Sequence, residues 1–105
     1  MHHKYLKDKI SLSLDESMDY IKKAIDLIGN RNEWAEKFRI MSENKQKEAL
    51  ELYTMFTQLY SENKKKDAYL ISIRDMIMDM FSDKMTKIEN YKVTYNLMVK
   101  DEEES

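Results

Sequence analysis

The side chains that could bind a metal ion are few and scattered. His2 and His3 are the only histidines, and a histidine third after a free amine can bind copper(II) or nickel(II). Met76, Met78 and Met80 carry soft thioethers, but on a helix Met78 would point away from the other two. Termini are seldom ordered, and alternating methionines usually fill a core or a deformable partner-binding face. We therefore expect neither a metal site nor a cofactor.

Acid/base chemistry would need carboxylates that face a pocket. Asp75, Asp79 and Asp83 instead form a row at four-residue spacing beside an apolar stripe, which is typical of a solvated acidic face and leaves a divalent-cation site as the alternative. The chain has no cysteine nucleophile and no E-x-x-H pair of the kind that binds di-iron centres in helical bundles. The sequence thus predicts no catalytic residues and a protein that is not an enzyme.

Basic side chains gather in two segments. Residues 1–12 carry a net charge of +2 and are expected to form a basic N-terminal arm, whereas residues 101–105 carry −4 and are expected to form an acidic C-terminal tail. The second basic segment is Lys64–Lys66, which the aromatic residues Tyr60 and Tyr69 flank in the sequence. Lysines and aromatic rings in this arrangement could bind along a single nucleic-acid strand. The candidate nucleic-acid-binding residues are Lys4, Lys7, Lys9, Lys64, Lys65 and Lys66. The overall net charge of −2 argues against a dedicated nucleic-acid binder.

Composition restricts the architecture more than the activity. The 105 residues include one glycine and no proline, so hairpin turns and phosphate-binding loops lack their usual residues, while 42% apolar residues suffice for the core of one domain. The absence of cysteine excludes disulfides and thiolate metal sites and favours a reducing compartment, so we expect a cytoplasmic protein. No apolar run approaches the roughly 20 residues of a membrane span, and no membrane partner is expected. The richness in Lys, Asn, Ile, Tyr and Met is typical of an AT-rich genome and leaves a viral and a low-GC bacterial origin open.

Apolar spacing predicts an all-α protein with a single helical domain over residues 13–100. Ser13 opens an S-x-x-E capping box, and apolar residues then recur every three or four positions as far as Gly29, which predicts a short helix over about 14–28. A second helix is expected from about Glu33 to Tyr60, then a turn at 61–67 in which Asn63 would supply any left-handed residue that the turn needs, and a third helix to about Met98.

These elements predict a short N-terminal helix followed by a long antiparallel helical hairpin, in a bundle that resembles a coiled coil. Segment 42–49 resembles segment 61–68, and a break at 42–46 or a kink at 82–83 would divide the three helices into four or five. A hairpin about 45 Å long exceeds a first helix of about 22 Å, so part of its apolar seam should face another chain.

We therefore expect a small non-catalytic interaction module that acts as an oligomer, most simply a homodimer. It would serve as an adaptor, an inhibitor or an assembly factor, with a protein partner or a second copy on its seam. Aromatic and methionine side chains dominate such contacts. The candidate partner-binding residues are Trp34, Phe38, Met76, Met80, Phe81 and Tyr91. The alternative is an accessory nucleic-acid-binding protein that uses the basic arm and the Lys64–Lys66 turn.

Overall fold

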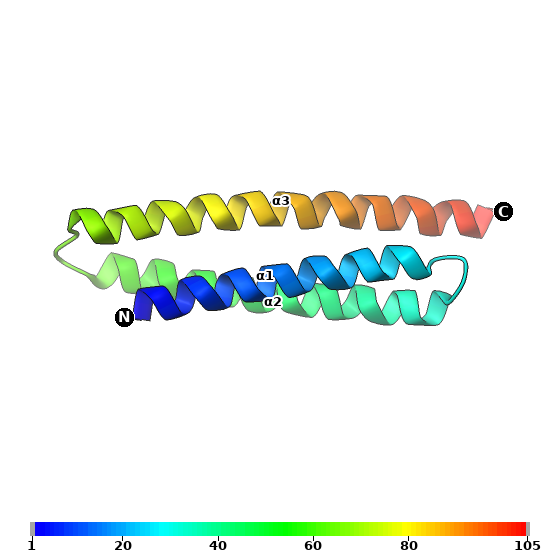
Figure 1. The fold of residues 1–105 in the computed structure, drawn as a ribbon, viewed down its shortest axis with the longest axis horizontal. Helices are drawn as coiled ribbons and strands as arrows, with labels where there is room; N and C mark the ends of the chain where they lie inside the picture. The colour runs from blue at the N-terminus through cyan, green and yellow to red at the C-terminus, as the bar shows by residue number, and fades with distance from the viewer. Residues whose placement is uncertain (1, 105) are drawn as a thin grey trace.

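The computed structural model describes residues 2–104, which form three helices and two short connections. The helices are α1 (His2–Leu27), α2 (Asn32–Glu62) and α3 (Ala68–Glu104). They run up, down and up along a rod of 59 × 17 × 15 Å (Figure 1), so α1 and α3 are parallel and α2 is antiparallel to both. The prediction of an all-α bundle of three helices is confirmed.

The first helix is longer than the sequence predicted. It begins at His2 rather than near Ser13, so residues 2–12, expected as a separate arm, form its first three turns. Leu6 and Ile10 from these turns are buried in the core. Ser13 does not cap a helix end, because it lies in the middle of α1, where its hydroxyl donates to Glu48 at 3.1 Å. At the other terminus residues 101–104 continue α3 instead of forming a tail.

Helices α1 and α2 are paired at seven-residue intervals. The His3 ring meets Phe56 edge to face at 5.9 Å, and Ser17 is hydrogen-bonded to Ser42 two heptads further along α1. The same register places Ile10 level with Ala49, and Ala24 level with Ala35. Most of these residues are small, which lets two antiparallel helices approach closely.

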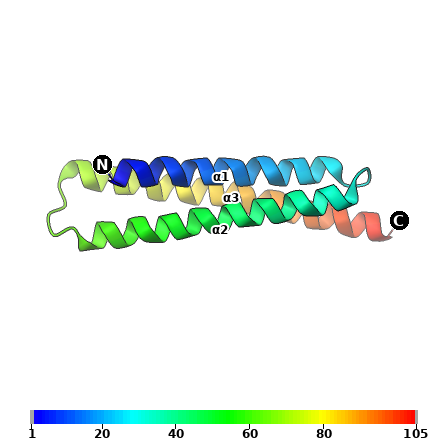
Figure 2. The ribbon, with the colours of Figure 1, turned by 90° about the horizontal axis from the view of Figure 1, so that it is seen from below.

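Helix α3 lies along one side of the α1–α2 pair (Figures 1 and 2). Ile77 and Ile88 of α3 are fully buried in the larger core cluster together with Leu14 and Phe56. Contacts between α2 and α3 are made by long side chains. The rings of Tyr53 on α2 and Phe81 on α3, for example, pack with their centroids 4.1 Å apart. A second, smaller cluster around Ile21, Ala24, Ala35 and Tyr95 lies nearer the Gly29 turn, so the core consists of two apolar clusters along the rod.

Local chemistry explains both connections. Gly29 has a φ of +83° and ends α1 as predicted, and its amide donates to the Asn32 side chain at 2.7 Å. In the second connection Asp67 accepts the Leu70 amide at 2.8 Å and caps α3. The turn does not use Asn63 as a left-handed residue, because its φ of −79° is ordinary extended backbone.

Helices α2 and α3 run without interruption through both proposed breaks, at 42–46 and at 82–83. The three helices are therefore not divided into four or five.

The length of α1 bears on whether the chain needs a partner. With 26 residues, α1 spans about 39 Å and covers the seam that a helix of about 22 Å would have left open. The uncovered seam therefore no longer argues for an oligomer, and any partner surface must be sought on the outside of the rod.

Candidate interaction surface

One apolar cluster on the outer surface lies near the Gly29 turn. Trp34, Phe38 and Met41 follow one another at helical spacing on α2, and together with Lys37 they line a hollow of about 280 Å³. Trp34 is 51% exposed and Met41 is 40% exposed. Large apolar side chains clustered on a surface are typical of sites where proteins meet. We call these four residues the tryptophan cluster.

Neighbouring residues hold the tryptophan cluster in place. The Arg31 guanidinium lies 5.0 Å from the centroid of the Trp34 ring, a cation–π contact that restrains an indole of which about half is exposed. The Phe38 ring lies 6.0 Å from that of Tyr20 on α1. A large, pre-positioned aromatic surface of this kind loses little conformational entropy on binding.

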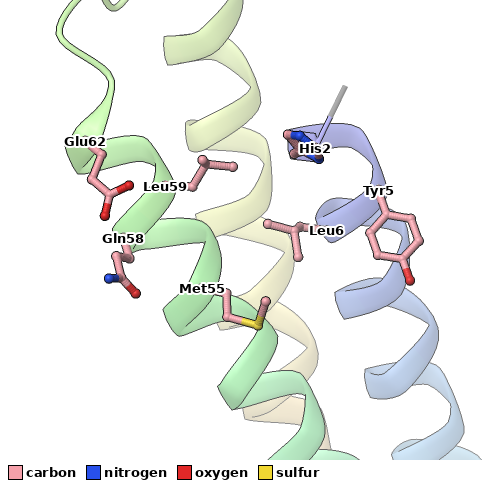
Figure 3. A pocket seen from close by; sticks show the side chains of 7 residues that line it. All are labelled: His2, Tyr5, Leu6, Met55, Gln58, Leu59 and Glu62. Atoms are coloured by element: carbon pink, nitrogen blue, oxygen red, sulfur yellow. The ribbon is translucent and has the colours of Figure 1, made fainter.

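A second hollow lies between α1 and α2 at the opposite end of the rod (Figure 3). It has a volume of about 450 Å³ and is mostly apolar, with polar groups at its margin. The residues that line it are His2, Tyr5, Leu6, Met55, Gln58, Leu59 and Glu62. Tyr5 is 61% exposed and Met55 is 54% exposed. We call this hollow the Tyr5 groove.

Charged residues separate the tryptophan cluster from the Tyr5 groove. Lys45 on α2 lies 3.3 Å from Glu48 and 3.4 Å from Glu16 on α1. The hydrogen bonds to Glu48 and Glu16 raise the pKa of Lys45. The outer face of α1 and α2 is thus apolar at both ends and ionic in the middle.

The six predicted partner-binding residues do not form one site. Trp34 and Phe38 lie together in the tryptophan cluster, whereas Met80 and Phe81 pack against the core. Tyr91 is partly buried against the other core cluster, with the Lys22 ammonium 5.3 Å from its ring centroid. Met76 is exposed on α3. Only two of the six candidates therefore share a surface.

The two lysine segments do come together. The start of α1 and the α2–α3 connection lie at the same end of the rod (Figure 1), so Lys4, Lys7 and Lys9 share that end with Lys64, Lys65 and Lys66. Part of this charge is already engaged, because Lys4 is paired with Asp8 at 3.0 Å. The Lys66 ammonium lies 5.1 Å from the centroid of the Tyr60 ring, a cation–π contact within the second lysine segment.

Sequence reasoning missed a polar network between α2 and α3. The Arg39 guanidinium donates two hydrogen bonds to Glu36, and these bonds lower the pKa of the Glu36 carboxyl group. The same guanidinium lies 3.2 Å from the Glu43 carboxylate. The Tyr95 hydroxyl donates to Glu36 at 3.2 Å, and burial, followed by the charge of Glu36, raises the pKa of the phenol. A phenol held in its protonated form is a hydrogen-bond donor rather than a base.

The same network continues toward the middle of the rod. Gln46, which is buried, donates to Glu89 at 2.7 Å and accepts from Lys92 at 3.2 Å. The spacing of Glu36, Arg39 and Glu43 along α2 was readable from the sequence, but their partners on α3 depend on a register that the sequence alone does not give. These residues hold the two helices in one alignment.

Within residues 2–104, no three His, Asp or Glu side chains are grouped so that they could hold a metal ion. None of the three helices in this range combines the length and the apolar character needed to cross a membrane. Comparisons of the chain with protein-family models, with curated proteins and with solved structures find no match.

Proposed function

We propose that this chain is a small, non-catalytic helical interaction module that acts in the cytoplasm as an oligomer. The tryptophan cluster is the observation that carries the proposal. A tryptophan that stays half exposed while an arginine guanidinium lies against its ring is typical of an interface anchor. Adaptor, inhibitor and assembly-factor roles all use such a surface.

The polar chemistry of the chain agrees with a binding role. The network around Glu36, Arg39 and Tyr95 pairs its charged groups with one another, so its members are engaged in holding α2 against α3. The sequence has no cysteine, and its two histidines stand at positions 2 and 3. Neither feature favours a nucleophile with an adjacent base.

Affinity capture from the native cell tests this function. The wild-type chain is expected to retain a protein, either its own copies or a second species, and Trp34→Ala with Met41→Ala should lose it. The matched control is Val93→Ala with Leu97→Ala, which removes two comparably exposed apolar side chains from α3 and should retain the partner. If the wild-type chain captures nothing and remains a monomer, the proposal is wrong.

A second candidate, an accessory nucleic-acid-binding protein, is favoured by one observation: all six candidate lysines lie at one end of the rod. Binding would then depend on release of counterions from phosphates, so retention on DNA or RNA should fall steeply between low and physiological salt. Replacing Lys64, Lys65 and Lys66 by Gln should weaken retention and flatten its salt dependence. No retention at low salt would exclude this candidate.

A further inference from the structure

The α2–α3 connection has a sequence that is helical elsewhere in the same chain. Segment 42–49 lies inside α2, and segment 61–68 differs from it only at Lys65 and Asp67, where the first segment has Gln and Glu. Neither segment contains Gly or Pro, the residues that cost most in a helix. None of residues 61–68 has a positive φ either. Nothing in the covalent chain therefore prevents this connection from becoming helical.

Local contacts hold the connection in its turn. Asp67 caps α3 through a backbone amide of the first turn, and the Lys66 ammonium lies 5.1 Å from the centroid of the Tyr60 ring. A continuous helix would lose these contacts, but residues 63–67 would gain the backbone hydrogen bonds of a helix. The cost of starting a helix is already met, because α2 and α3 flank the connection on both sides. Local chemistry thus supports both forms.

The buried stripes of α2 and α3 also share one heptad phase. Phe56 of α2 and Leu70 and Ile77 of α3 are buried, and they follow one another at intervals of 14 and 7 residues. Asn63, midway between Phe56 and Leu70, would take the matching position in a helix that ran through the connection. A single asparagine at such a position is a known determinant of register in paired helices. A straight extension would therefore present one unbroken stripe.

A second copy of the chain can replace the contacts that a straightened connection gives up. When α2 and α3 form one helix, α3 leaves its own bundle and projects beyond the end of the rod. Helix α3 of a copy related by a two-fold axis at the connections then runs back along α1 and α2, antiparallel to α2 as in the single chain. The core contacts of α3 are made again, between chains instead of within one. This association needs no new surface and no charge complementarity.

We propose that this chain forms a dimer by exchange of α3, with segment 61–68 as the hinge. Short connections favour such an exchange. The continuous helix over residues 32–104 is about 110 Å long, and two such helices run antiparallel through two three-helix bundles. The tryptophan cluster lies near the Gly29 turn, at the opposite end from the hinge, so one copy remains exposed at each far end of the doubled rod. The inference rests on the proposed function and specifies how its oligomer forms.

Two variants of the hinge test the exchange. Lys65→Gln with Asp67→Glu gives segment 61–68 the sequence of segment 42–49 and replaces the capping residue of α3, so the dimerisation constant should rise at least about tenfold. Lys64→Gly with Lys65→Gly keeps that cap but places two poor helix formers in each hinge, so the constant should fall at least about tenfold. Size-exclusion chromatography with light scattering measures both after refolding, and circular dichroism verifies that the variants are helical.

Carbodiimide coupling shows whether a dimer has exchanged α3. The Lys84 ammonium of α3 lies 2.6 Å from the Asp15 carboxylate of α1, so the reagent should join the two side chains without a spacer. An equal mixture of isotope-labelled and unlabelled wild-type chains is refolded together, and the coupled dimer is digested for mass spectrometry. About half of the Asp15–Lys84 links should join a labelled to an unlabelled chain, as random pairing in a two-fold dimer requires. Lys84→Arg keeps the charge but lacks the amine, and should abolish this link.

Two results would overturn the inference. If the wild type and Lys65→Gln with Asp67→Glu both remain monomeric up to about 100 μM, no exchange occurs at a useful affinity. If a dimer forms but its Asp15–Lys84 links never join chains of different label, each chain keeps its own α3. In both cases capture of a protein that depends on Trp34 and Met41 would still support the proposed function, so the two failures are distinguishable.

Discussion

Ser17 and Ser42 each donate a hydrogen bond to the other's backbone carbonyl across the α1–α2 interface. The Ser17 hydroxyl lies 2.8 Å from the Ser42 carbonyl oxygen, and the Ser42 hydroxyl lies 2.7 Å from that of Ser17. Both side chains are buried, and a serine side chain is short, so the two backbones must be close at this level. This pair fixes both the spacing and the register of the first two helices.

Enlarging Ser42 should therefore separate α1 from α2. Ser42→Leu inserts a branched side chain where only a hydroxymethyl group fits, and we expect a loss of about 1–3 kcal/mol in the free energy of unfolding. Urea denaturation followed by circular dichroism measures it. The matched control is Ser61→Leu, at the equivalent position of the similar segment 61–68, where the residue is exposed and the change should stay within about 0.5 kcal/mol. Equal effects of the two substitutions would contradict the interpretation of the serine pair.

Phe56 is the largest of the fully buried side chains. Phe56→Ala removes its ring from the core and from its contacts with His3 and Tyr60, and should cost about 3–5 kcal/mol. Leu97→Ala, on the exposed side of α3, serves as the control and should be close to neutral. A loss below about 1 kcal/mol at Phe56 would show that this end of the rod is not a packed core.

The turn between α1 and α2 depends on one glycine. Gly29→Ala adds a β-carbon at a φ of +83°, which should cost about 1–2 kcal/mol from backbone conformation alone. The new β-carbon would stand 3.5 Å from the nearest Glu102 side-chain atom, an ordinary contact that adds no clash. Asn30→Ala is the neighbouring control, because its φ is not positive, and thermal unfolding compares the two. An unchanged Tm in Gly29→Ala would rule out this account of the turn.

Stability should fall as the pH drops below neutrality because of His3. Burial lowers the pKa of His3 below its ordinary value of 6.5, and its buried Nε2 has no hydrogen-bond partner within residues 2–104. The unfolded chain therefore binds a proton at a higher pH than the folded chain does. The contribution of His3 is fully present above pH 6.5 and is lost as the pH falls through the folded pKa.

Unfolding measurements between about pH 7.5 and pH 5 check this expectation. His3→Phe keeps an aromatic ring against Phe56 but has nothing to protonate, so its stability should depend less on pH than that of the wild type. His2→Phe leaves His3 in place and should retain the wild-type dependence. If His3→Phe and the wild type lose stability in parallel, another group is responsible.

The two similar segments show what sequence alone could and could not decide. Segment 42–49 continues α2, whereas 61–68 spans the end of α2, the turn and the first residue of α3. In the first segment Ser42, Gln46 and Ala49 all face the core, and in the second the equivalent Ser61, Lys65 and Ala68 are all exposed. One difference is visible in the sequence: the first segment has Gln46 at the position where the second has Lys65, and glutamine is easier to bury than lysine. The role of Ser42 is not visible there, because it depends on the contact with Ser17 on α1. Tertiary packing, not local propensity, keeps the first segment helical.

The start of α1 could have been predicted from Leu6 and Ile10, which the sequence analysis assigned to a basic arm. Leu6 and Ile10 precede Leu14 at four-residue spacing and extend its apolar stripe upstream. The basic charge of the segment and the capping box at Ser13 favoured a later start, but a capping sequence also occurs inside helices, where a buried serine can bond to a neighbouring helix. The four-residue spacing of Trp34 and Phe38 already places them on one face of a helix. The partner of Glu36 on α3, in contrast, depends on the register between helices, which only the packed structure supplies.

The seven-residue pairing of α1 with α2 has a consequence for how the chain acquires its structure. Ala24 and Ala35 are separated by only 11 positions, and each following pair, Ser17 with Ser42 and Ile10 with Ala49, is formed by residues further apart in the sequence. Closing the short loop at Gly29 costs little chain entropy, and each pair then brings the next one within reach. We expect the α1–α2 hairpin to form from its turn at Gly29 toward the first residues of α1. Helix α3 should then pack against the hairpin once it has formed.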